Sequence, residues 1–229
     1  MVQPKNPIAI LLFARSAFAE RKAKGLPGGI RLHQMLLAHT QQTIQASGLP
    51  CYTFSEKEQH GPDFGSRLFH AMQSVFLQGV QKLIVLGADT PQLKPSHIGL
   101  AIQALDRGEQ SLGPSEDGGF YLWGLDHQQF QQINFNKLPW QQGQLLEDLS
   151  VQIKHNQAQI TFLEPLGDLD RTSDFTLLGK RQGVPLGLHL FLRMVLANLD
   201  KCFKILSQKY IPKVFVNVYY NKGSPLTLA

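Results

Sequence analysis

Asp89 lies where an apolar run of the sequence passes into a turn. The run Lys82–Leu86 is typical of a strand buried in a parallel sheet, and Gly87–Pro91 (GADTP) follows it directly. Ligands of open parallel sheets bind at the carboxyl ends of the strands, so the Asp89 carboxylate is predicted to face such a crevice. There it could bind Mg²⁺ or Mn²⁺, which prefer oxygen ligands. Asp89 could equally stabilise the turn or cap the next helix.

A second acidic group occurs at Asp168 and Asp170. Alternate residues of an extended segment point the same way, so these two side chains could supply further metal ligands beside Asp89. A structural role is the alternative, because a Thr or Ser that follows can cap a helix whose N-terminus favours acidic residues. Both roles are compatible if Asp174 supports the helix while Asp170 binds the metal.

A glycine-rich segment, Gly113–Phe120 (GPSEDGGF), forms a third candidate. Gly118 and Gly119 allow a ligand to approach the backbone closely, and Asp117 could accept hydrogen bonds from hydroxyl groups. With Phe120 these residues could bind an acceptor substrate. The same sequence also favours a hairpin turn with no ligand role.

A basic segment follows the first apolar run of the chain. Residues 14–29 are predicted to form a loop in which Arg15, Lys22 and Lys24 could neutralise a diphosphate. A solvated basic loop is the alternative. The sequence contains no Walker A motif, no GxGxxG and no GxSxG, so a P-loop protein, a Rossmann dinucleotide site and a serine hydrolase have no support.

Strand and helix patterns alternate along the chain, which predicts a mostly parallel sheet covered by helices on both faces. The hydrophobic periodicity predicts strands over 8–13, 50–54, 82–86, 110–113, 120–125 and 159–163, and helices over 30–48, 66–78, 95–105, 141–153 and 173–180.

The sequence divides near residue 183. Residues 1–183 are predicted to form the catalytic core, and residues 184–229 a helix-strand appendage, with an amphipathic helix over 185–209 and a strand over 213–220. The appendage could pack on the core or form the interface of a homodimer.

Composition sets the broad class. The chain has 229 residues, 43% of them hydrophobic and 17% charged, with a net charge of +5. No block of basic residues indicates nucleic-acid binding, and no apolar stretch is long enough to span a membrane. Cys51 and Cys202 are isolated in the sequence, so neither a disulfide framework nor a zinc site is indicated. With no visible signal peptide, a cytoplasmic protein is predicted.

The motifs occur in the order found in one family. The sequence resembles DUF2064, a group of bacterial proteins assigned to GT-A-type glycosyltransferases. The resemblance extends over about residues 8–180, and it is carried by four motifs: Asp63–Leu68 (DFGSRL), Gly87–Leu93 (GADTPQL), Gly113–Leu122 (GPSEDGGFYL) and the acidic Asp168, Asp170 and Asp174. They are also similar to motifs of guanylyltransferases of the CofC and MobA kind.

The resemblance implies a three-layer αβα sandwich of the nucleotide-diphospho-sugar transferase type. It implies a metal-dependent glycosyltransferase that uses a nucleoside-diphosphate sugar and an unknown acceptor. A nucleotidyltransferase of the CofC/MobA kind is one alternative. A non-catalytic nucleotide-binding protein is another, because the first loop lacks the family's turn residues and its Lys-Thr-Arg triplet, and Trp140 is followed by two glutamines.

Overall fold

The six strands form one mixed sheet with the order β2-β1-β3-β5-β4-β6. The computed structural model describes residues 8–179 and 181–210. Neighbouring strands are parallel except where β5 pairs antiparallel with β3 and β4. The predicted mostly parallel α/β fold is therefore confirmed. The strands are β1 (Ile8–Phe13), β2 (Cys51–Phe54), β3 (Lys82–Leu86), β4 (Gln110–Pro114), β5 (Phe120–Asp126) and β6 (Ile160–Phe162).

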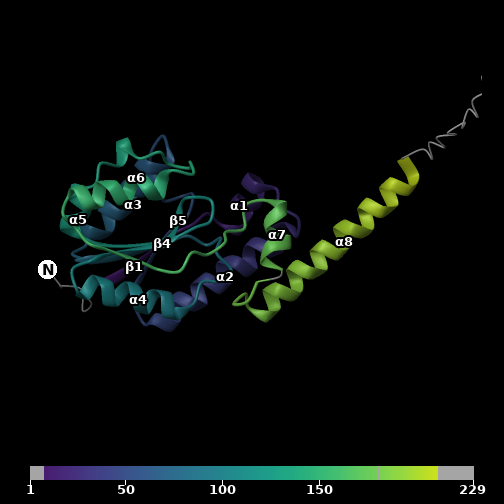
Figure 1. Cartoon of the computed structure of the whole chain (residues 1–229), viewed down its shortest axis with the longest axis horizontal. Helices are drawn as coiled ribbons and strands as arrows, with labels where there is room; N and C mark the ends of the chain where they lie inside the picture. The colour runs from purple at the N-terminus through teal and green to yellow at the C-terminus, as the bar shows by residue number, and fades with distance from the viewer. Residues whose placement is uncertain (1–7, 180, 211–229) are drawn as a thin grey trace, which may run out of the picture.

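Helices cover both faces of this sheet, as Figure 1 shows. On one face α3 (Phe64–Phe76), α5 (His127–Gln132) and α6 (Leu145–His155) enclose a large apolar core. On the other face α2 (Gly29–Ser47) and α4 (Pro95–Asp106) bury the alternate residues of β1 and β3. Because β1 is buried on both faces, all six of its residues are apolar.

Several segments differ from the sequence prediction. Residues 17–24, predicted as part of a loop, form helix α1 (Ala17–Lys24). Its N-terminus is capped by Ser16, whose side chain accepts a hydrogen bond from the backbone of Ala19. The predicted helix at 141 begins only at Leu145, because Gln141 adopts a left-handed backbone conformation with φ 62°. The short helix η1 (Phe135–Lys137) had no recognisable periodicity.

The C-terminal helix α8 (Leu186–Tyr210) packs on the core through its first turns. Its buried residues Leu188, Phe191, Leu192 and Val195 join a separate apolar cluster with α2 and α7 (Thr172–Leu178). Beyond this contact α8 extends away from the sheet (Figure 1). The helix therefore agrees with the predicted 185–209, whereas the predicted strand at 213–220 lies outside the described residues.

Candidate functional site

Four carboxylates line one cavity at the carboxyl edge of the sheet. The cavity has a volume of about 220 Å³ and is lined by Asp89, Asp117, Asp168 and Asp170, with Gly119 and Phe120. Asp89 follows β3, Asp117 follows β4, and the other two lie in the segment after β6. Parallel strands end at the same edge of a sheet, so residues 81 positions apart in the sequence meet here.

Backbone hydrogen bonds hold the acidic segment beside Asp89. The amide of Leu166 donates to the carbonyl of Pro114 at 3.0 Å, and the amide of Leu169 donates to the carbonyl of Asp89 at 3.0 Å. The Asp174 carboxylate then accepts hydrogen bonds from the backbone amides of Asp170 and Arg171, at 2.9 and 2.7 Å. Asp174 thus supports the start of α7 as predicted, while Asp168 and Asp170 are left at the cavity.

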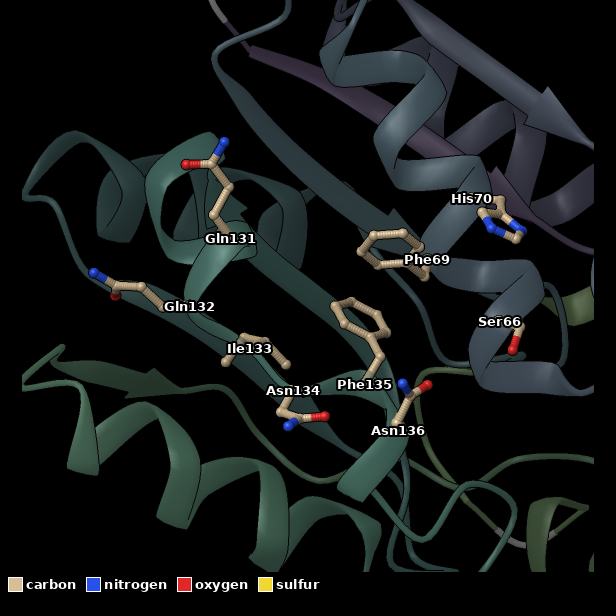
Figure 2. A pocket seen from close by; sticks show the side chains of 9 residues that line it. All are labelled: Ser66, Phe69, His70, Gln131, Gln132, Ile133, Asn134, Phe135 and Asn136. Atoms are coloured by element: carbon tan, nitrogen blue, oxygen red, sulfur yellow. The ribbon is translucent and has the colours of Figure 1, made fainter.

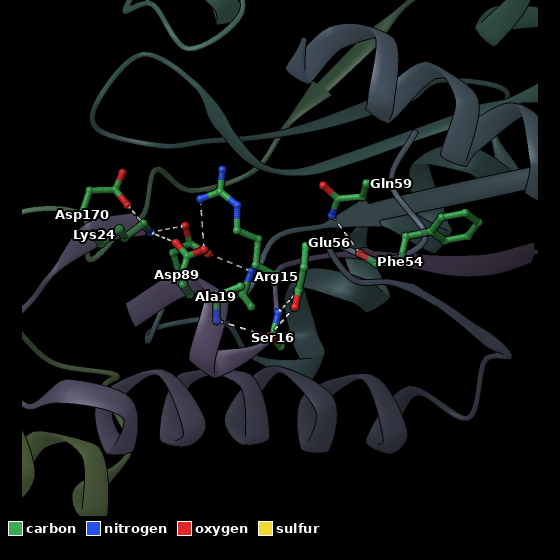
Figure 3. Close-up of polar contacts among 11 residues, drawn as sticks. Arg15, Ser16, Ala19, Lys24, Phe54, Glu56, Gln59, Asp89 and Asp170 are labelled. Carbon is green, nitrogen blue, oxygen red and sulfur yellow. Dashed lines mark hydrogen bonds and ion pairs between the residues drawn. The ribbon is translucent and has the colours of Figure 1, made fainter. Parts of the chain in front are cut away.

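Lys24 occupies the centre of the acidic group, where its ammonium contacts three carboxylates (Figure 3). The Nζ atom lies 2.7 Å from Asp89 Oδ2, 2.5 Å from Asp170 Oδ1 and 2.9 Å from Glu20 Oε1. Burial opposes the charge on Lys24, but the attraction of these carboxylates outweighs it and raises its pKa. Asp170, which the sequence analysis predicted as a metal ligand, is thus paired with Lys24 in this structure.

The three basic residues predicted to bind phosphate do not lie together. Arg15 and Lys24 line a small cleft with Asp89, and Arg15 pairs with Glu20 at 3.4 Å. Lys22 lies on the other side of α1, in a separate cavity with Phe18 and Gly29. Lys22 and Lys24 are both on α1, and residues two positions apart on a helix point in different directions. The two side chains therefore do not face the same ligand.

The carboxylates around the Lys24 ammonium are of a kind that could also bind a divalent cation. Asp89 and Asp170 already converge on one cationic atom, and Mg²⁺ usually takes only one or two carboxylates, with substrate phosphates and water as further ligands. Among the described residues, no group of three or more His, Cys, Asp or Glu is arranged to hold a metal ion by itself. The position therefore suits a cation that arrives with a phosphate-bearing ligand.

Asp168 has a different environment from Asp89. Its Oδ1 accepts a hydrogen bond from Thr90 Oγ1 at 2.5 Å. Burial, together with the negative charges of Asp89, Asp117 and Asp170, raises the pKa of Asp168 to about 7. Burial also raises the pKa of Asp170, although Lys24 acts in the opposite direction. Thr90 was not among the predicted site residues, although its place directly after Asp89 could have indicated it.

The glycine-rich segment is a hairpin turn that also borders the cavity. It joins the antiparallel strands β4 and β5, and Asp117 Oδ1 accepts hydrogen bonds from Ser115 Oγ and the amide of Gly119, at 2.5 and 3.0 Å. Gly118 has φ 89°, and a Cβ there would overlap the carbonyl of Gly143. Both predicted roles are thus compatible, since the turn brings Asp117, Gly119 and Phe120 to the cavity.

Aromatic side chains form the wall opposite the carboxylates. Phe13 and Phe64 line the cavity and meet edge to face with ring centroids 5.5 Å apart. Trp140 packs behind Phe64 and so closely over Gly65 that a Cβ there would overlap its indole. Gln141 and Gln142, which follow Trp140, complete the lining. The aromatic wall was missed, because apolar residues of this kind also match ordinary core positions.

A larger cavity of about 560 Å³ lies outside the carboxylate site, between α3 and the segment from α5 to η1 (Figure 2). The rings of Phe69 and Phe135 lie at its centre, and its lining contains no acidic residue, Lys or Arg. Phe135 stacks on Trp140, so the two cavities lie on opposite sides of one aromatic cluster.

The motifs and the geometry agree with one family. Residues 31–142 match the family DUF2064, described as an uncharacterized protein conserved in bacteria. The match includes Asp89 and the glycine-rich turn but not the acidic segment at 168–170, so it is shorter than the resemblance drawn from the motifs. No curated protein matches the sequence.

The chain is similar to several solved structures, to different degrees. A "putative nucleotide-diphospho-sugar transferase" from Desulfovibrio desulfuricans G20 superposes with a TM-score of 0.71 at 17% identity, covering 86% of this chain and 98% of that one. CMP:2-keto-3-deoxy-manno-octonic acid synthetase complexed with CTP has a TM-score of 0.45 at 14% identity, covering 75% of this chain and 96% of that one. Glucosyl-3-phosphoglycerate synthase from Mycobacterium tuberculosis, in complex with Mg²⁺ and uridine diphosphate, has a TM-score of 0.42 at 12% identity, with 85% and 78% covered. The first likeness shows that this chain has the same fold as that protein.

Proposed function

We propose that this protein is a metal-dependent glycosyltransferase that binds a nucleoside-diphosphate sugar at the carboxyl edge of its sheet. One observation carries the proposal: carboxylates that follow β3 and β6 and line one cavity converge on a single cation position. Four carboxylates line this cavity of about 220 Å³, and they would repel a diphosphate unless a cation lay between the diphosphate and the carboxylates. The site therefore calls for a divalent cation together with an anionic ligand.

Each side of the cavity has a role in this proposal. Asp89 and Asp170 hold Mg²⁺ or Mn²⁺, with Asp168 beside them, and a bound metal ion stabilises the leaving diphosphate. Arg15, whose side chain is 38% exposed, lies at the rim where it can neutralise phosphate oxygens. The turn with Asp117, Gly118 and Gly119, together with Phe120, positions the acceptor.

Asp168 is a candidate for proton transfer. A general base works best when its pKa lies near the working pH, and burial among like charges brings Asp168 to about 7. Asp117 lines the cavity and uses one carboxylate oxygen, Oδ1, to hold the turn. A hydroxyl of the acceptor could thus be bound by Asp117 while a neighbouring carboxylate receives its proton.

A nucleotidyltransferase of the CofC/MobA kind is the second candidate, because the same cation position would suit a nucleoside triphosphate. A non-catalytic nucleotide-binding protein is the third. It is favoured by the placement of Lys22, which lies in a different cavity from Asp89 and so leaves fewer cations for the phosphates.

A thermal-shift screen with and without Mn²⁺ separates these candidates. A ligand that binds only the native state raises the free energy of unfolding by mass action, by about 2.7 kcal/mol at 100 times its Kd, and so raises the melting temperature. We expect nucleoside diphosphates and their sugars to raise it only with Mn²⁺. Stabilisation by triphosphates alone would favour the nucleotidyltransferase. Binding without turnover of any acceptor would favour the non-catalytic protein.

A further inference from the structure

The ammonium of Lys24 lies where a divalent cation would bind. Its two shortest contacts are to Asp89 Oδ2 and Asp170 Oδ1, at 2.7 and 2.5 Å, and the Lys24 side chain ends between these two residues (Figure 3). The side chain of Lys24 is 17% exposed, against 38% for Asp89 and 39% for Asp170. The ammonium therefore fills the space between the carboxylates, and solvent reaches them from outside.

A metal ion and this ammonium cannot share the position. Two cations placed between the same two carboxylate oxygens would lie within a few ångströms of each other, where their repulsion is strong in a partly buried site. Both oxygens that contact Nζ would also be needed as metal ligands. Binding of a divalent cation thus requires the ammonium to move.

Helix α1 offers the displaced side chain a place. Lys24 is in the last turn of α1, and the next residue, Gly25, ends the helix in a left-handed conformation with φ 60°. Glu20 lies one turn earlier on the same helix and contacts Nζ at 2.9 Å. The flexible lysine stem can therefore leave Asp89 and Asp170 while it keeps Glu20 as a partner.

We propose that Lys24 is an internal cation, which occupies the position between Asp89 and Asp170 in the nucleotide-free protein and competes there with Mg²⁺ or Mn²⁺. The choice of these metals rests on the function proposed above. In the free protein, Lys24 keeps the carboxylates compensated and keeps metal affinity low. Displaced Lys24 lies at the entrance to the cavity, where it can contact the phosphates that arrive with the metal.

The test is a titration of nucleotide-free protein with Mn²⁺ alone, followed by electron paramagnetic resonance of the unbound ion. The variants are Lys24→Gln and, as a control with the same change in charge, Lys22→Gln, whose side chain lies in the other cavity. We expect Lys24→Gln to bind Mn²⁺ at least about tenfold more tightly than the wild type, and Lys22→Gln to match the wild type. Adding Asp89→Asn to Lys24→Gln should abolish the gain.

Equal Mn²⁺ affinity in the wild type and Lys24→Gln, or no binding by either, would overturn the inference. That failure is separate from failure of the proposed function, because the wild type would still bind nucleotide in the presence of Mn²⁺ if only the inference were wrong. Circular dichroism checks that each variant is folded. Lys24→Met retains an aliphatic stem and replaces Lys24→Gln if the latter does not fold, with the same expected gain and the same contradicting result.

Discussion

The carboxylates of the cavity are chemically similar but lie in different environments. Asp89 and Asp170 contact the ammonium of Lys24, whereas Asp168 accepts its hydrogen bond from the neutral Thr90. The contacts of Asp168 thus include no cation to compensate its burial, and its pKa is raised to about 7. This difference leads to a prediction about stability at the residue scale.

We expect Asp168→Asn to stabilise the metal-free protein at both pH values, and by clearly more at pH 8 than at pH 5. The folded state of the wild type keeps a proton on Asp168 that the unfolded state loses above its usual pKa of 3.8, so the free energy of unfolding falls as pH rises from about 4 to about 7. Above pH 7 the decrease in the free energy of unfolding is constant and amounts to no more than roughly 4 kcal/mol.

Urea unfolding of the metal-free protein at the two pH values measures this effect. Asp200→Asn is the control, because Asp200 is exposed on α8 and loses the same charge. If Asp168→Asn and the control shift the unfolding midpoint equally at pH 8, the special environment of Asp168 is refuted.

At the scale of elements, the sequence identified the strands better than the segments between them. The strand β3 and the acid after it could be predicted, because an apolar run followed by a turn leaves little choice of structure. Helix α1 was missed, because its basic and small residues give only a weak apolar stripe, with no buried residue. The contact of Lys24 with Asp89 was missed for the same reason, since it depends on where α1 places residue 24.

Helix α8 gives a matched pair of leucines with opposite environments. Leu192 is fully buried against α2 and α7, whereas Leu190 is 56% exposed. We expect Leu192→Ala to lower the free energy of unfolding by about 2–5 kcal/mol, through lost burial and the cavity left behind. Leu190→Ala should change it by no more than about 0.5 kcal/mol.

Chemical unfolding of both variants tests whether the start of α8 is part of the core. The protein concentration should be one at which light scattering gives the monomer mass, since a homodimer through the exposed face of α8 stays a prediction. Equal effects of the two substitutions would show that α8 does not pack as described.

At the scale of the whole molecule, the charge distribution and the fold point to one kind of ligand. The chain carries a net charge of +5, yet its cavity at the carboxyl edge holds four carboxylates. No helix among the described residues is long and apolar enough to cross a membrane. The net positive charge of the chain favours the approach of an anion, and the acidic cavity favours a cation that accompanies it. The cytoplasmic location predicted from the sequence stays a prediction.

The most direct test of this account is calorimetry of a nucleoside diphosphate binding in the presence and absence of Mn²⁺, with the wild type and Asp89→Asn. The Asp89 carboxylate accepts hydrogen bonds from the adjacent Ala88 amide and from Lys24, and Asn keeps the size of the side chain. The variant should therefore stay folded. We predict that the wild type binds the diphosphate only with Mn²⁺ and that Asp89→Asn loses this binding at least tenfold. Equal affinity of the variant and the wild type, or wild-type binding that is independent of Mn²⁺, would contradict the account.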